Sequence, residues 1–346
     1  KTIGFDGRIV SHEMGKQIED VCCHHVSMIY DLDLVGDIWK ERPGIVPSQI
    51  YEIPLKVTGE TTASKLERLR AEMNETDWLL VSRLEDIAWI YNLRGRDVEH
   101  TPVFYAFALI SKKEDILYVM DDSYIKRSAS SADGSAKTAV RRYAEVFEDL
   151  KQLADCTIML DKDSVSYALA KSPAEKLKAV KNGTEIKATE DAHIRDGAAM
   201  AEFLYWLKNS VSTGQVTEIS LAEHLESCRR RRGAYDLSFD TIAGYEEHGA
   251  IIHYSATESS SAVLKPEGFV LIDSGGQYDD GTTDITRTVA LGPVSGDRKK
   301  VYTAVLKAHV ALAMAIFDEN TTGADLDIIA RKPLRELGLD FNHGTG

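Results

Sequence analysis

The sequence predicts an α+β protein whose C-terminal half is preceded by a separate α/β unit. Helix-like and strand-like patterns alternate between residues 46 and 175, which is typical of an α/β unit. After residue 176 the long helices are grouped apart from the strands, and a strong turn signal, Asp279-Asp280-Gly281, joins two strand-like runs. With 346 residues, 43% of them apolar, the chain is long enough for two domains with their own cores.

Residues 1–45 resemble the end of a domain whose beginning is absent. They contain a strand-like run, Thr2–Phe5, and an amphipathic segment around Met14–Met28. The stretch Trp39–Pro54 carries three of the eight prolines and is predicted to be a linker. The chain begins with Lys1 rather than Met and shows no signal-peptide pattern. We therefore expect it to be a piece of a longer protein.

Residues 46–175 form the predicted α/β unit. A capping box at Ser64 and Glu67 is expected to begin its first helix. The predicted elements are helices over 66–73, 84–91, 139–153 and 165–171, and strands over 78–82, 102–111, 116–120 and 157–160. We interpret Asp121-Asp122 and Ser128–Ser135 as solvated loops. The unit has no glycine-rich phosphate loop and no nucleophile motif, so we predict no chemistry for it.

Residues 176–346 form the predicted α+β unit. Its predicted elements are helices over 184–211, 217–232, 297–317 and 324–337, strands over 239–243 and 249–254, and a hairpin over 269–291.

The hairpin carries a carboxylate on each arm, Asp273 and Asp284, where an apolar strand would not place one. If the two residues pair directly, the centre of the turn falls between Tyr278 and Asp279, whereas the turn-forming residues are Asp280 and Gly281. We therefore expect a β-bulge. Two carboxylates held close together repel each other unless a cation lies between them, and oxygen ligands suit a hard divalent metal. The alternative is that one or both acids only decorate strand ends beside a solvated turn.

Two histidines are candidates for chemistry. His253 lies in the apolar run GAIIHY just before the hairpin, and His343 lies in FNHGTG. An isolated histidine on an apolar strand is more often a satisfied core residue, but convergence on two acids favours a functional role. His193 and His309 in helices and His248 in a loop are weaker candidates.

Charge and cysteine content exclude several classes of protein. The net charge of −14 disfavours nucleic acids and anionic membranes as partners. The run Arg229–Arg232 is interpreted as a solvated helix end rather than a nucleic-acid site. No apolar run reaches the roughly 20 residues of a membrane span. Cys22, Cys23, Cys156 and Cys228 fit neither a zinc site nor a disulfide framework, which predicts reduced thiols and a cytoplasmic protein.

Several blocks of the sequence resemble one family. In the second half they are HIRDGAAMAEFLYWL (193–207), LSFDTIAGYEEHGAIIHY (237–254), LIDSGGQYDDGTTDITRTVALG (271–292) and LDFNHGTG (339–346). In the middle unit they are SKLERLRAEM (64–73), SRLEDIAWIYNLRG (82–95) and PVFYAFALI (102–110). These blocks look like cytosolic aminopeptidase P, an Xaa-Pro aminopeptidase of the creatinase and methionine aminopeptidase superfamily, which has the pita-bread fold.

The resemblance implies a domain organisation. Residues 1–45 would be the remnant of a first N-terminal domain, 46–175 a second, non-catalytic creatinase N-terminal-like domain, and 176–346 an incomplete pita-bread catalytic domain. It also implies a metalloaminopeptidase that cleaves between an N-terminal residue and a following proline, by attack of a metal-bridging hydroxide. The implied partners are peptides with proline second, and a second copy in a homodimer.

The resemblance also assigns the site. Asp273 and Asp284 would be ligands of two divalent ions, usually Mn(II), while His253 and His343 would bind substrate and serve catalysis. The family pattern continues with a histidine and two glutamates that are absent here, so two of five expected metal ligands are present. We therefore expect the 346-residue chain to bind metal weakly or partly and to be inactive. His248 stands where the family commonly has asparagine.

Two alternatives remain open. A prolidase-like Xaa-Pro dipeptidase would share the metal ligands but hold the peptide ends differently. A non-catalytic pita-bread module would bind protein or peptide, although such a module has no need to retain Asp273, Asp284, His253 and His343 together.

Overall fold

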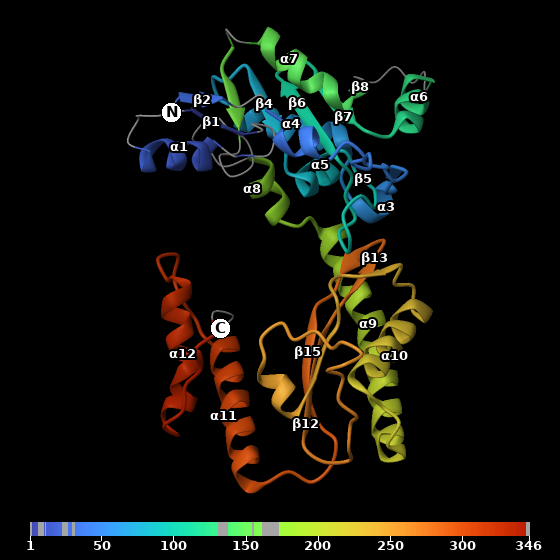
Figure 1. Cartoon of the computed structure of the whole chain (residues 1–346), viewed down its shortest axis with the longest axis vertical. Coiled ribbons are helices and arrows are strands. Elements are labelled where there is room, and N and C mark those ends of the chain that lie inside the picture. Colours follow the sequence, from blue (N-terminus) through green and yellow to red (C-terminus); the bar gives the residue numbers. More distant parts are fainter. Residues whose placement is uncertain are drawn as a thin grey trace. The chain divides into compact units, whose positions relative to one another are not determined.

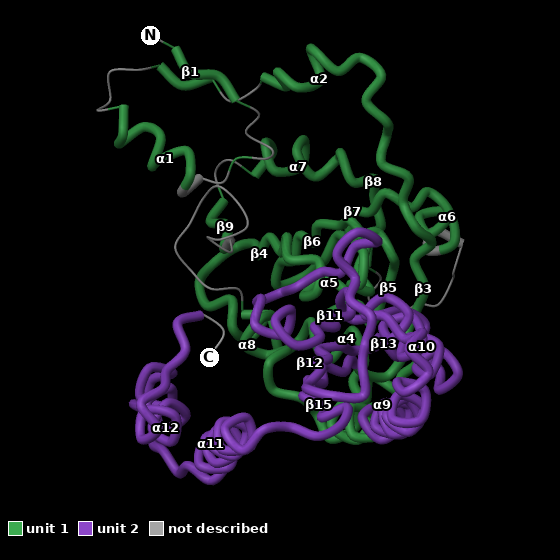
Figure 2. Tube along the Cα trace, turned by 60° about the horizontal axis from the view of Figure 1, so that its bottom comes forward, with its two compact units in different colours: residues 1–192, 279–281 green, residues 193–278, 282–346 purple. Residues whose placement is uncertain are grey.

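The computed structural model describes residues 2–5, 10, 12–22, 27–29, 32–130, 138–153, 156–160 and 173–343. The chain divides into two compact units, coloured separately in Figure 2. Unit 1 comprises residues 1–192 with the hairpin tip 279–281, and unit 2 comprises residues 193–278 and 282–346. Within the described residues, no helix is both long and apolar enough to cross a lipid bilayer.

Unit 1 opens with a small two-stranded sheet. Strand β1 (Thr2–Gly4) pairs in parallel with β2 (Ser27–Ile29), and helices α1 (His12–Val21) and α2 (Leu34–Ile38) follow them in the chain. The predicted linker is irregular from residue 42 to residue 50, where β3 (Tyr51–Glu52) begins.

The main sheet of unit 1 has five strands in the order β8-β7-β6-β4-β9. Their bounds are β4 Trp78–Val81, β6 Ala106–Ser111, β7 Asp115–Val119, β8 Ala139–Arg142 and β9 Ile158–Leu160. The central pairs are antiparallel, whereas both edge strands run parallel to their neighbours. All five residues of β7 are buried, as expected for an inner strand covered on both faces.

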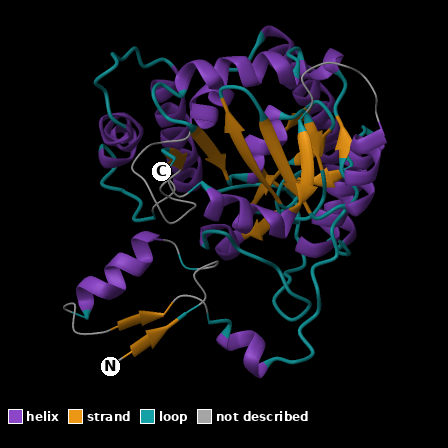
Figure 3. Ribbon diagram, turned by 90° about the horizontal axis from the view of Figure 1, so that it is seen from above, coloured by secondary structure: helices purple, strands orange, loops and turns teal. Residues whose placement is uncertain are grey.

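Helices cover both faces of this sheet (Figure 3). On one face lie α4 (Thr62–Glu72), α5 (Leu84–Ile90) and α8 (Pro173–Ala179), and on the other lies α7 (Val146–Gln152). The short elements α3 (Leu55–Thr58), β5 (Leu93–Arg94), η1 (Tyr143–Glu145) and α6 (Asp122–Ser130) connect them. The predicted α/β class of this unit is confirmed.

Four predictions for unit 1 are wrong. Asp122 and residues 128–130, predicted to lie in loops, belong to helix α6. The helix predicted over 139–153 begins as edge strand β8, because pairing with β7 overrides local helix preference. The first helix begins earlier than predicted, since Thr61 rather than Ser64 caps it. Asp121 is buried, not solvated, and accepts a bond from the backbone N–H of Ile50 at 3.0 Å. The helix predicted over 165–171 lies outside the described residues.

Unit 2 is built on a three-stranded antiparallel sheet, β11-β12-β15. Its strands are β11 (Ile242–Tyr245), β12 (Phe269–Ser274) and β15 (Ile285–Ala290). Helix α9 (Gly183–Ser210) begins in unit 1, and its residues 193–210 belong to unit 2. That part of α9 and the helix α10 (Glu218–Arg231) lie along one side of these strands (Figure 1). Val270 and Ile272 of β12 are fully buried against this helix layer, which leaves the opposite face of the sheet for Leu271 and Asp273.

The rest of unit 2 forms a second sheet and a helix pair. A second sheet has the order β10-β13-β14, from Asp236–Leu237, Gly276–Tyr278 and Gly281–Thr282. Helices α11 (Gly296–Ala313) and α12 (Gly323–Arg335) pack side by side (Figure 1). The four predicted long helices of this unit are confirmed, and helices grouped apart from antiparallel strands confirm the predicted α+β class.

Candidate active site

The acidic hairpin has one continuous register. Asp273 on β12 lies opposite Thr286 on β15. Nearer the turn, the backbone N–H of Thr283 donates to the carbonyl of Gly276 at 3.0 Å, which continues the same pairing. Between them lies Gly275, where a Cβ atom would stand 1.9 Å from the Thr283 carbonyl oxygen. Only glycine therefore allows the two arms to approach so closely.

This register corrects the prediction for the two acids. The turn residues are Asp279 and Asp280, and both arms have the same number of residues between the turn and the pair Ser274–Ile285. The described hairpin therefore lacks the predicted bulge. Asp284 precedes Thr286 by two residues and lies on the same face of the hairpin. The two carboxylates are therefore diagonal neighbours, which is within reach of their side chains, rather than a directly opposed pair.

The two acids interact electrostatically. The pKa of Asp284 is raised by partial desolvation of its carboxyl group, then by the charge of Asp273 and a hydrogen bond to it. The residue as a whole is exposed, so the desolvation is local and modest. Thr286 donates its hydroxyl to Asp273 Oδ1 at 2.8 Å. The fold thus brings two acids together without a neutralising base among their described partners.

His253 does not lie on a strand, which corrects the predicted strand over 249–254. That segment forms the 3-10 helix η3 (Glu246–Ala250) followed by a turn. His253 is exposed and has a left-handed backbone, with φ +55°, which is uncommon for a residue other than glycine. The apolar run therefore forms a surface loop, because two of its residues, Ile251 and Ile252, are exposed rather than packed in a sheet.

The close approach of Gly244 and Gly249, called the glycine crossing below, places the segment that carries His253 over the sheet. Gly244 on β11 pairs with Leu271, and a Cβ atom on Gly244 would lie 2.7 Å from the backbone nitrogen of Gly249. A Cβ atom on Gly249 would in turn lie 3.4 Å from the Cβ of Leu271. Leu271 shares its face of β12 with Asp273. The His253 segment therefore crosses the same face of the sheet that carries the acids.

His343 lies at the end of the described chain. It is exposed, and its ring stacks on that of Phe341 with centroids 4.8 Å apart. Phe341 in turn packs against the guanidinium of Arg331 on α12, at 3.8 Å from its ring centroid. The contacts of His343 with Phe341, and of Phe341 with Arg331, thus attach this end of the described chain to α12.

The site fits a divalent metal in part. Asp273 and Asp284 offer hard oxygen donors. Desolvation is the larger cause of the raised pKa of Asp284 and the charge of Asp273 the next, and a cation would relieve the repulsion between the two carboxylates. Among the described residues, however, no group of three or more histidine, cysteine, aspartate or glutamate side chains is arranged to hold a metal ion. The described residues thus provide two ligands, fewer than a closed metal site requires.

A separate pocket lies in unit 2. Its volume is about 530 Å³, and its lining includes Glu246, His248, Lys265 and Arg298. None of the four predicted site residues lines it. Arg298 is already engaged in a double ion pair with Glu246, at 2.8 and 2.6 Å.

The sequence missed a buried polar network on the long helices. Arg229 on α10 was predicted to be solvated, but it is fully buried and pairs with the buried Asp196 on α9 through Nε, at 2.7 Å. Tyr278 also donates its hydroxyl to Asp196, at 2.9 Å. The other three arginines of the run are exposed, as predicted. Asp196 lies among the buried apolar residues of α9, and this position in the sequence could have indicated a buried partner of opposite charge.

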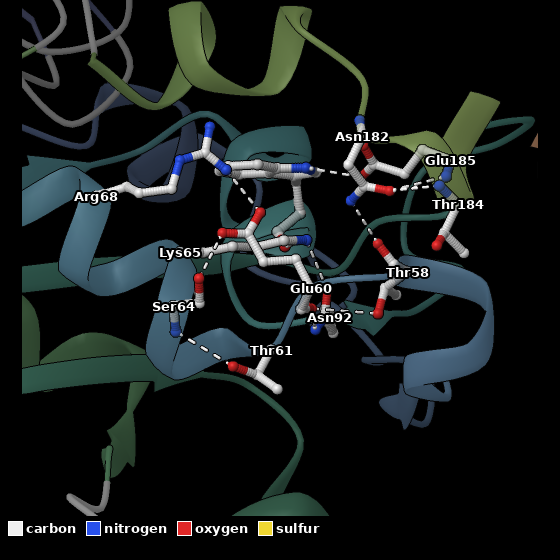
Figure 4. Close-up of polar contacts among 11 residues, drawn as sticks. Thr58, Glu60, Thr61, Ser64, Lys65, Arg68, Asn92, Asn182, Thr184 and Glu185 are labelled. Carbon is white, nitrogen blue, oxygen red and sulfur yellow. Dashed lines mark hydrogen bonds and ion pairs between the residues drawn. The ribbon is translucent and has the colours of Figure 1, made fainter.

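A second missed cluster surrounds Lys65 in unit 1 (Figure 4). Lys65 is 1% exposed and donates to the Trp89 carbonyl at 2.9 Å and to Asn92 Oδ1 at 2.8 Å. Burial lowers its pKa to about 8. Nearby, Asn182 accepts bonds from the first backbone N–H groups of α9 and donates to Thr58. The cluster is internally satisfied, so its role is structural.

Comparison with known families defines the class of protein. Residues 41–185 match the Creatinase/Prolidase N-terminal domain, and residues 187–346 match metallopeptidase family M24. The fold is therefore a creatinase-type N-terminal domain followed by a pita-bread domain.

Individual relatives agree. Aminopeptidase P1 of Arabidopsis thaliana is 36% identical over 91% of this chain, and a probable Xaa-Pro aminopeptidase P of Laccaria bicolor is 34% identical over 99%. The chain spans only 58% and 57% of those two relatives. Residues 187–346 of this chain thus match metallopeptidase family M24, and the chain as a whole is a homologue of aminopeptidase P.

Solved structures show the same fold. The X-prolyl aminopeptidase of Caenorhabditis elegans, described as a cytosolic enzyme with a di-nuclear active site, matches all of this chain with a TM-score of 0.85 and 28% identity. The match covers 60% of that protein. An Xaa-Pro dipeptidase of Bacillus anthracis matches 80% of this chain and 78% of its own, with a TM-score of 0.64 and 26% identity.

Proposed function

We propose that the natural protein is a metal-dependent Xaa-Pro aminopeptidase that releases an N-terminal residue followed by proline. The observation that carries this proposal is the pair Asp273 and Asp284 on one face of the hairpin, within a chain similar to aminopeptidase P throughout. The di-nuclear site of the C. elegans neighbour supports the same reading.

In this proposal Asp273 and Asp284 hold divalent ions through their carboxylate oxygens. Two such ions, for which we propose Mn(II), would supply charge stabilisation for the developing oxyanion and an activated water at neutral pH. The Thr286 hydroxyl, bonded to Asp273 Oδ1 at 2.8 Å, orients that carboxylate from the opposite strand. The acids carry no base among their described partners, which leaves them available to a cation.

His253 and His343 are proposed to act on the substrate. The nitrogen of a bond before proline has no hydrogen, so it must receive a proton as the bond breaks. The exposed His253, on the loop that crosses the Asp273 face, is proposed to hold that proton and to bind the peptide. The exposed His343 is proposed to bind substrate as well.

The proposed partners are peptides with proline in the second position and a second copy of the chain, and the proposed location is the cytoplasm. The C. elegans neighbour, a cytosolic enzyme, supports the location. The similarity to the Xaa-Pro dipeptidase of B. anthracis makes a dipeptidase the second candidate, although its TM-score of 0.64 is lower than the 0.85 of the aminopeptidase.

The proposal is tested by Asp284→Ala in the natural protein. We expect this change to abolish Mn(II)-dependent release of the first residue from an Xaa-Pro tripeptide, while Asp279→Ala in the exposed turn retains it. A tripeptide also separates the candidates, because a dipeptidase would cleave only the Xaa-Pro dipeptide. Full activity with all metal chelated would overturn the proposal.

For the 346-residue chain itself, calorimetric titration with Mn(II) is the direct measurement. Because the described residues provide two carboxylates and no third ligand group, we expect weak binding that Asp273→Asn removes. Tight binding of two ions would show that further ligands act.

A further inference from the structure

A buried carboxylate anchors the segment that carries His253. Glu218 is fully buried and has hydrogen bonds with four residues. Its Oε1 receives the backbone N–H of Tyr245 at 2.7 Å, and its Oε2 receives the backbone N–H of Ala262 at 2.9 Å and the hydroxyl of Tyr254 at 3.1 Å. The Nδ1 atom of His248 lies 2.9 Å from Oε1.

These partners bracket one loop. We call residues 246–262 the His253 loop. Tyr245 immediately precedes it, Ala262 ends it, and Tyr254 follows His253 directly in the chain. A single side chain therefore fixes the entry, the middle and the exit of the loop. The rings of His248 and Tyr254 also stack on each other, with centroids 4.5 Å apart.

Glu218 is itself held rigidly. It is the first residue of α10, where the helix dipole favours a negative charge. The capping box of Thr217 and Ser220 fixes this helix start. The backbone N–H of Glu218 donates to the Ala262 carbonyl at 3.1 Å, so the helix start and the loop exit bond to each other in both directions.

His253 depends on such an anchor. Its left-handed backbone is a conformation that persists only when the surrounding structure holds it. The loop also crosses the sheet at Gly249, over the face that carries Asp273. The position of the loop therefore decides where His253 stands relative to the two acids.

We propose that Glu218 is the positioning residue for His253: by bonding both ends and the middle of the His253 loop, it sets the place of that histidine over the acidic face. Glu218 is inaccessible to substrate and solvent, so it acts only through the loop. The effect of Glu218 on catalysis rests on the proposed function. Its anchoring of the His253 loop, the structural part of the inference, does not.

The structural part is tested by amide hydrogen exchange on the 346-residue chain. The glutamine side chain in Glu218→Gln has one oxygen in place of two, so it cannot accept all the hydrogen bonds of the carboxylate. We therefore expect exchange of the backbone amides in the His253 loop to accelerate at least tenfold, with α9 and β12 unchanged. Tyr254→Phe, which removes only one of the hydrogen bonds to Glu218, should accelerate exchange less. The matched control is Glu223→Gln, an exposed glutamate on the same helix. Unchanged loop exchange in Glu218→Gln would overturn the inference.

The catalytic part is tested on the natural protein with an Xaa-Pro tripeptide. We expect Glu218→Gln to lower kcat at least tenfold and, because His253 is also proposed to bind the peptide, to raise KM. The Mn(II) requirement should change little, and Glu223→Gln should match the wild type. A merely structural role would lower the amount of folded enzyme without lowering kcat per active site. Loop exchange that accelerates without any loss of kcat would overturn the positioning role. An inactive wild type would instead refute the proposed function and leave the exchange result standing.

Discussion

Asp196 and Arg229 form an ion pair in which both side chains are fully buried, with Nε of the arginine 2.7 Å from Oδ1 of the aspartate. The pair joins α9 to α10 behind the sheet that carries the acids. A second bond, from the arginine NH2 to Oδ2 at 3.2 Å, makes the contact bidentate, which is the strong geometry for this pair.

Removal of one member of this pair should be costly. Asp196→Ala leaves a buried guanidinium without its carboxylate, so we expect the free energy of unfolding to fall by about 3–5 kcal/mol. Urea unfolding followed by circular dichroism measures this change. Glu226→Ala breaks an exposed pair with Arg230 on α10 and should cost under ~1 kcal/mol. Equal effects of the two variants would contradict the structure.

The pair Asp273 and Asp284 should destabilise the folded chain when no metal ion is bound. In the metal-free chain, partial desolvation and then the charge of Asp273 raise the pKa of Asp284, so two ionised carboxylates oppose folding at neutral pH. Asp284→Asn should therefore raise the thermal midpoint at pH 7 in the presence of a chelator. The gain should stay below ~1 kcal/mol, because the residue is exposed.

The stabilisation by Asp284→Asn should decrease as the pH falls. The folded pKa of Asp284 is raised, so the folded state takes up its proton first as the pH falls and the advantage of asparagine disappears on acidification. Thermal scans at pH 7 and about pH 4 check this, with Asp279→Asn in the turn as the control. A lower midpoint for Asp284→Asn at pH 7 would refute the repulsion.

Lys65 should give unit 1 a distinct pH dependence. Its folded pKa of about 8 lies below the ordinary value of 10.5, so the cost of its buried charge is present below pH 8 and is relieved as the pH rises to 10.5. Relative to that of Lys65→Met, the free energy of unfolding of the wild type should rise by on the order of 2–3 kcal/mol across this pH range.

Denaturant midpoints at several pH values between 7 and 10.5 measure the difference between the two proteins. Lys56→Met, at an exposed lysine of the same unit, controls for the loss of one surface charge. Parallel curves for wild type and Lys65→Met would show that the lysine is charged at no cost, against the burial that lowers its pKa.

The glycine crossing should not tolerate a side chain. Gly244→Ala places a Cβ atom 2.7 Å from the backbone of Gly249, so we expect a loss of about 1–3 kcal/mol and a displaced His253 loop. Gly197→Ala, in α9 with nothing within 4 Å, should instead stabilise by roughly 0.5–1 kcal/mol. Thermal melts of both variants distinguish the two cases, and a stabilising Gly244→Ala would contradict the close crossing.

The segment around His253 shows why part of the site escaped the sequence. Its run of apolar residues favours a strand, yet two of them, Ile251 and Ile252, are exposed in a turn. The bonds of Glu218, 30 and 36 residues away from its partners His248 and Tyr254, decide this shape. Local preference cannot report an acceptor that is so distant in sequence.

The sequence by itself determined the class of the two units, the long helices, and the acidic turn-linked strands with Asp273 and Asp284. Periodicity, turn residues and charge are local properties, so the chain displays them directly. The tertiary structure decided the diagonal rather than direct placement of the acids, the burial of Arg229 and Lys65, and the loop that carries His253. Those features depend on register and on partners far apart in the chain, and they acquire their energies only when the elements pack.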